Sequence, residues 1–104
     1  MFVGAYREFG YEDGPSIRAS LASSPYPERD AVIDYLRGGG RSLACGTGVN
    51  VDAITGELAS LESEVRTDGE FSWSTFLAHY VEKYNLRLSS EFTERAVASY
   101  RRGV

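Results

Sequence analysis

The stretch that decides the fold is ASLESEVRTDGEFSW, residues 59–73. In its first half, apolar residues alternate with Glu62, Glu64 and Arg66, which is typical of a strand with one buried and one charged face. Thr-Asp-Gly at 67–69 is a turn signal, because the glycine can adopt a positive φ. A two-residue loop would put aromatic residues on the charged face. A three-residue loop avoids this, so we expect strands near 58–66 and 70–73 with the pairs Val65–Phe71, Ser63–Trp73 and Arg66–Glu70.

The residues before this hairpin continue the alternating pattern. Leu43 and Cys45 alternate with small or polar neighbours, and Val49 and Val51 do the same after Gly-Thr-Gly at 46–48. A turn at these glycines would set Cys45 opposite Val49 and Leu43 opposite Val51, with all four side chains on one face. The sequence thus predicts an antiparallel β-meander of about four strands, near 41–45, 49–54, 58–66 and 70–73.

Three amphipathic helices are predicted to pack against this sheet. An apolar stripe at helical spacing is clearest over 74–84, and the next helix, 89–102, begins with Ser89 as an N-cap. A further helix over 27–37 ends at three consecutive glycines. Together the patterns predict a single α+β domain over 1–104. Residues 1–26 are expected to form a less regular N-terminal extension, with a short strand at 2–6 and a short helix over 16–21 capped by Asp13.

The charge of the chain bears on the partners it can bind. The 104 residues carry a formal net charge of −4. Residues 1–70 hold twelve acidic and six basic side chains, against three and five in the remainder. This balance argues against nucleic-acid binding, which depends on neutralising phosphates, and favours a basic protein partner. The sequence has no run of about 18 apolar residues and no signal-peptide pattern, so we expect no membrane span and a cytoplasmic location.

Residues with catalytic or metal-binding potential are few. Cys45 is the only cysteine, which excludes an intrachain disulfide and a cysteine-based zinc site, and its strand position predicts a small buried side chain. His79 is the only histidine and has no evident activating partner on its face of the predicted helix. The run LACGTG at 43–48 resembles the glycine-rich first motif of S-adenosylmethionine-dependent methyltransferases, but Ser42 replaces the usual acid and no helix follows. We predict no catalytic residue, cofactor or metal.

Acidic residues and tyrosines are the candidates for a partner-binding surface. Carboxylates spaced by two on a strand point the same way, and tyrosines beside an acidic rim are typical of protein interfaces. An alternative for the tyrosines is that they pack against the domain. The predicted partner-binding residues are Glu57, Glu62, Glu64, Asp68, Glu70, Tyr11 and Tyr26.

Three short runs carry a resemblance to a known group: TDGEFSW at 67–73, YVEKYN at 80–85 and EF at 91–92. They resemble a pattern in short bacterial proteins of the immunity type that accompany secreted toxins. The resemblance implies a small acidic protein that covers the active site of its partner, and it assigns no site residues. Our leading hypothesis is an immunity or antitoxin-like inhibitor of a basic toxin domain. The alternatives are a small enzyme or ligand-binding protein with a pocket between sheet and helices, and a homodimeric accessory protein.

Overall fold

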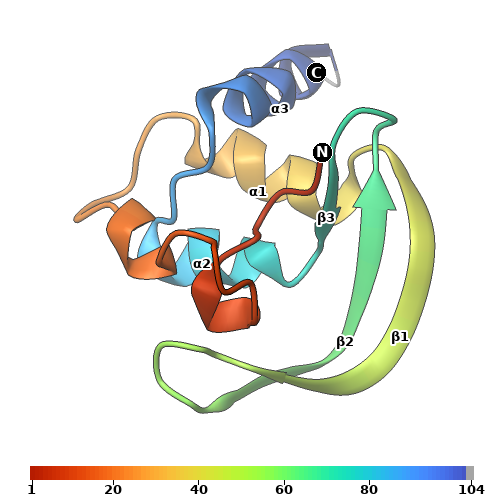
Figure 1. The fold of residues 1–104 in the computed structure, drawn as a ribbon. Helices are drawn as coiled ribbons and strands as arrows, with labels where there is room; N and C mark the ends of the chain where they lie inside the picture. Colours follow the sequence, from red (N-terminus) through yellow and green to blue (C-terminus); the bar gives the residue numbers. More distant parts are fainter. Residues whose placement is uncertain (103–104) are drawn as a thin grey trace.

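The computed structural model describes residues 1–102 and has the α+β fold that the sequence predicts (Figure 1). Two short 3-10 helices, Arg7–Phe9 and Ile17–Ser20, come first. They are followed by α1 (Arg29–Gly38), β1 (Arg41–Val51), β2 (Leu58–Thr67), β3 (Ser72–Ser74), α2 (Leu77–Tyr84) and α3 (Ser90–Arg102). The strands form one antiparallel sheet in the order β1-β2-β3.

The helices lie where the sequence predicts them, because their ends are marked by local signals. The hydroxyl of Ser89 accepts a hydrogen bond from the backbone N–H of Phe92, as expected of an N-cap. Asn85 ends α2 in the left-handed conformation, at φ 56°. In the N-terminal segment the cap is Ser16, not Asp13, because the Ser16 hydroxyl accepts from the N–H of Arg18.

The meander has three strands instead of about four, since the predicted strands 41–45 and 49–54 are one strand. Gly46 and Gly48 are not among the positive-φ glycines, and the chain runs through them in extended form. The reversal lies at residues 52–57. There the carboxylate of Asp52 accepts the N–H groups of Ile54 and Thr55, and Gly56 adopts φ 78°. A carboxylate that caps two N–H groups stabilises this turn better than glycines alone could stabilise one at 46–48.

The predicted register between β2 and β3 is wrong. The observed pairs are Val65–Ser74, Arg66–Trp73 and Thr67–Ser72. Phe71 is drawn into the turn, because the Asp68 carboxylate accepts its N–H and the Thr67 hydroxyl donates to its carbonyl. Residues that oppose each other in a sheet share a face, so Arg66 lies on the same face as Trp73. The charged face of β2, not its apolar face, is therefore the one continuous with the core.

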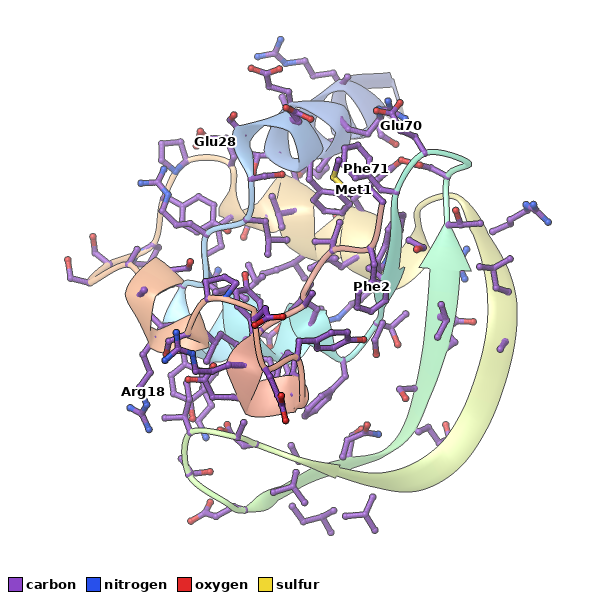
Figure 2. All side chains as sticks on the ribbon, in the orientation of Figure 1. Met1, Phe2, Arg18, Glu28, Glu70 and Phe71 are labelled. Atoms are coloured by element: carbon purple, nitrogen blue, oxygen red, sulfur yellow. The ribbon has the colours of Figure 1, made fainter. Side chains whose placement is uncertain are left out.

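The core lies between the helices and the β3 end of the sheet, where side chains crowd in Figure 2. Trp73 is fully buried, and its ring centroid lies 5.2 Å from those of Tyr35 in α1 and Phe92 in α3. Its indole N–H donates to the carbonyl of Leu36 over 2.8 Å. Arg66 reaches the same end of α1 and donates to the carbonyl of Gly39. These contacts join the sheet to α1 and α3.

The N-terminal segment packs onto this body. The predicted strand 2–6 is reduced to a single parallel bridge between Phe2 and Ser72, beside β3. Tyr6 and Ile17 are buried, and Leu21 forms a bridge with Leu86 after α2. No helix within residues 1–102 combines the length and the apolar character needed to cross a bilayer.

Candidate functional site

The part of the β1–β2 hairpin that extends past β3, residues 43–64, stands apart from the helical body and is called the arm below. Figure 1 shows it curving away from the helices until its tip returns beneath α2. Four large apolar side chains of the arm are exposed: Leu43 by 53%, Val49 by 69%, Val51 by 44% and Leu58 by 59%. The prediction that Leu43, Val49 and Val51 face the core is wrong. The register that puts Trp73 beside Arg66 leaves the apolar residues of the arm without a helix to cover them.

Three irregularities shape the arm. The pairing of β1 with β2 shifts between Ser42 and Ala44, between Thr47 and Asn50, and between Asn50 and Val51. Leu43 is the extra residue in the first bulge, and in the second Gly48 and Val49 of β1 stand against one residue of β2. The third shift places the extra residue on β2. Bulges bend a strand and increase its twist, which accounts for the curvature of the arm.

One face of the arm carries acidic side chains. Glu64 opposes Cys45 and Glu62 opposes Thr47 in the ladder. Glu62 is exposed, as is Glu57 at the tip, whereas Glu64 is partly buried and forms a 2.8 Å ion pair with Arg66. The hydrogen bond from Arg66 is the main cause that lowers the pKa of Glu64. Cys45 lies opposite Glu64 and is exposed, so the prediction of a buried thiol is wrong.

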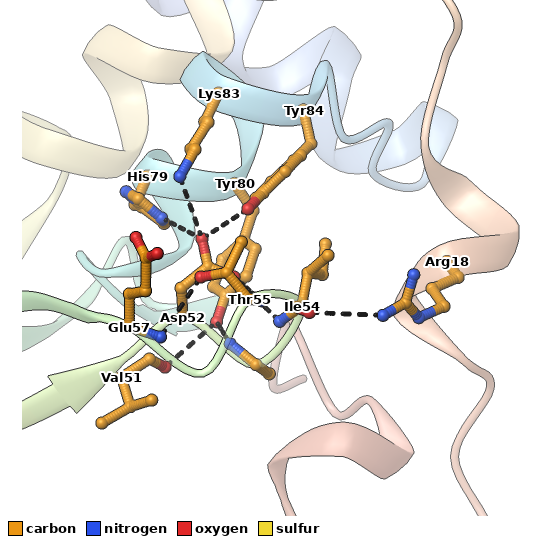
Figure 3. A network of polar contacts seen from close by, with 11 residues as sticks. Arg18, Val51, Asp52, Ile54, Thr55, Glu57, His79, Tyr80, Lys83 and Tyr84 are labelled. Atoms are coloured by element: carbon orange, nitrogen blue, oxygen red, sulfur yellow. Dashed lines mark hydrogen bonds and ion pairs between the residues drawn. The ribbon is translucent and has the colours of Figure 1, made fainter.

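The tip of the arm is fastened to α2 through Asp52 (Figure 3). The Asp52 carboxylate is buried, and its Oδ2 lies 2.8 Å from Nε2 of His79 and 2.7 Å from the hydroxyl of Tyr84. Nζ of Lys83 lies 3.8 Å away. Burial raises the pKa of this carboxyl, but the hydrogen bonds from His79, Tyr84 and two backbone N–H groups outweigh burial, and the pKa is lowered. Asp52 therefore remains ionised and holds the tip in place.

This network brings together a histidine, a carboxylate and a hydroxyl, a combination that can support acid–base catalysis. No sequence pattern predicts it, since 27 positions separate Asp52 from His79. Its geometry is that of an anchor, because Asp52 is shielded and each of its bonds ties the tip to itself or to α2. Several of the best-formed hollows among residues 1–102 are lined by other residues. Within that range, no group of three or more histidine, cysteine or acidic residues could hold a metal ion.

Several of the predicted partner-binding residues are engaged within the fold. The Asp68 carboxylate accepts a 2.6 Å hydrogen bond from Tyr35, and Arg95 forms ion pairs with both Asp68 and Glu70. Burial raises the pKa of Asp68, but the bonds from Tyr35 and the turn N–H groups prevail and lower it. Tyr26 is buried, as in the packing alternative, and donates to the carbonyl of Leu86.

The predicted residues that are exposed and make no such ion pair are Glu57 and Glu62 on the arm and Tyr11 in the N-terminal segment. The ring of Tyr11 stacks on Phe2 at 5.9 Å, beside a small apolar hollow of about 230 Å³. The structure thus separates the candidate surface into two areas, of which the arm carries both the apolar and the acidic side chains.

No protein-family model matches the chain, and no curated protein and no solved structure shows significant similarity to it.

Proposed function

We propose that the protein is a protein-binding module, specifically an immunity or antitoxin-like inhibitor that covers a basic toxin domain, and that the arm is its docking surface. The observation that carries the proposal is the exposure of Leu43, Val49, Val51 and Leu58 on one hairpin. Several large apolar side chains exposed on one element are typical of an interaction site.

Charge supports a basic partner. The exposed Glu57 and Glu62 lie on the same hairpin as the apolar side chains, and the whole chain carries a net charge of −4. Apolar and acidic side chains exposed on one element match the composition of an interface, which combines apolar and polar residues. The negative field would also accelerate encounter with a basic protein.

The proposal can be tested by capturing the partner from the cells that make the protein. The wild type is compared with the double variant Val49→Ser, Leu58→Ser and with Tyr100→Ser, which changes a side chain on α3 that is 45% exposed. Each captured protein is identified, purified and titrated against all three forms. We expect a basic partner whose Kd rises at least tenfold for the double variant and stays unchanged for Tyr100→Ser, and whose toxic activity the wild type blocks.

Equal affinity of the wild type and the arm variant would overturn the arm as docking surface. Circular dichroism of each variant establishes that it is folded. Sedimentation of the free protein distinguishes the homodimer alternative, because a dimer that dissociates in the double variant would show that the arm binds a second copy instead.

A further inference from the structure

We infer that the arm binds its partner by strand addition along β1, and that the incoming segment is extended, with basic and apolar residues in alternation. This inference rests on the proposed function and specifies the partner and the mode of binding.

The outer edge of β1 is open to such a segment. β1 is the end strand of the sheet, whereas the edge at β3 is occupied by residues 1–3 through the Phe2–Ser72 bridge. Within its eleven residues β1 has no proline, no lysine and no acid, and its single charge is Arg41 at the start. Proteins commonly protect long edge strands with such residues, because unpaired N–H and C=O groups recruit other strands. Here the bulges bracket a regularly paired stretch, 44–47, without other protection.

The two faces of the arm determine which side chains an added strand should carry. On one face, Glu64 and Glu62 lie on β2, at the positions that pair with Cys45 and Thr47 of β1. An added strand would lie about 10 Å from β2, a distance that the long side chains of arginine or lysine can span towards these carboxylates. Because side chains alternate between faces, the neighbouring residues of that strand would point to the opposite face.

That opposite face is apolar. In the regularly paired stretch it carries Ala44 opposite Val65 and Gly46 opposite Ser63, because neighbouring residues of a strand alternate between faces. None of these four residues is charged, and Ala44 is exposed and Val65 partly buried. An apolar side chain on the added strand would cover this surface. An alternating basic and apolar segment therefore complements both faces at once.

Charge makes a second copy of this chain a poorer occupant of the edge. Pairing β1 with β1 would add the Glu62 and Glu64 of one copy to the same face as those of the other, with Arg41 as the only basic residue on each strand. Each copy also carries a net charge of −4. Like charges on one sheet face are destabilising, whereas basic residues on a foreign strand would neutralise the acidic row.

The test uses the full-length protein and two capped peptides of equal composition and charge. In the first peptide the two residue types alternate, Arg-Val-Arg-Val-Arg-Val-Arg. In the second they are grouped, Arg-Arg-Val-Val-Val-Arg-Arg. Affinity is measured by NMR titration, and amide hydrogen exchange is followed along β1. We expect the alternating peptide to bind at least fivefold more tightly and to slow amide exchange within residues 44–47.

Variants assign the contribution of charge. Glu62→Gln should lower the affinity for the alternating peptide about two- to fivefold, as expected for the loss of one solvent-accessible ion pair. Glu94→Gln, the same change at an exposed position on α3, should leave the affinity unchanged.

Three results would overturn strand addition: no binding of the alternating peptide up to millimolar concentration, equal binding of both peptides, or binding without protection of the β1 amides. Protection of these amides by self-association alone would identify a second copy as the occupant and would also reject the inference. None of the first three results bears on capture of the partner, which tests the proposed function separately through the Val49→Ser, Leu58→Ser variant.

Discussion

At the scale of single residues, carboxylates organise the turns of this protein. Asp52 caps the tip of the arm, Asp68 caps the turn between β2 and β3, and Glu8 accepts bonds from the Ser16 hydroxyl and the Ile17 N–H. A carboxylate satisfies several N–H groups at once, which is why such residues favour turns. Glu57 and Glu62 are exposed on the arm and free of ion pairs within residues 1–102, which leaves them available to a partner.

Asp52→Asn should test the anchor. The amide keeps the shape of the side chain but loses the charge that strengthens the bonds from His79 and Tyr84. We expect the free energy of unfolding at pH 7 to fall by about 2–3 kcal/mol, measured by denaturant titration. Asp34→Asn, a change at an exposed position on α1, is the matched control and should cost less than about 0.5 kcal/mol.

The same variant should alter the pH dependence of stability. The pKa of Asp52 is lowered from an ordinary value of 3.8, so the unfolded chain takes up a proton first as the pH falls. Stability from this carboxylate is complete above that value and is lost below it, as the pH falls towards the lowered pKa. The wild type should therefore lose stability more steeply than Asp52→Asn below about pH 4. Parallel curves for the two proteins would contradict an ionised anchor.

At the scale of elements, the helices were predictable and the arrangement of the strands was not. The apolar stripe of a helix is recognised from many residues at once, so one exceptional residue does not hide it. Ser89 and Asn85 also mark helix ends through their own backbone or side-chain geometry. A strand register depends on one loop, and a shift of one residue exchanges its faces. Asp68 draws Phe71 into the turn through bonds that no alternating pattern reveals. The Asp52–His79 contact was equally hidden, because it joins a strand end to a distant helix.

Matched valine substitutions test whether the arm is packed against the helical body or exposed to solvent. Val49 was expected to face the core but is 69% exposed, whereas Val32 in α1 is fully buried. Val49→Thr should change the free energy of unfolding by less than about 0.5 kcal/mol. Val32→Thr should cost about 1–3 kcal/mol, because it buries a hydroxyl. Urea titrations of both variants measure the difference, and a cost at Val49 as large as that at Val32 would mean that the arm is packed against the body.

At the scale of the whole molecule, the N-terminal segment is part of the folded body. Its bridge to Ser72 joins it to β3. Farther along, the N–H of Ala22 donates to the carbonyl of Asn85, and the N–H of Arg87 donates to the carbonyl of Ser20. The segment therefore contacts both ends of β3–α2, and Ile17 between these contacts is fully buried. A radius of gyration of 13.1 Å is that expected of a compact domain of about 100 residues, so the curved arm does not make the molecule elongated.

These contacts predict that the chain unfolds in one transition. Ile17→Ala removes a fully buried side chain and should lower the free energy of unfolding by about 2–5 kcal/mol. Leu58→Ala removes similar apolar volume from a side chain that is 59% exposed and should cost far less. Fluorescence of the buried Trp73 and far-ultraviolet circular dichroism should report the same midpoint for each variant. If Ile17→Ala left the Trp73 transition in place while the dichroism signal changed earlier, residues 1–26 would be a separately folding extension, and the stability of the body that supports the arm would not depend on them.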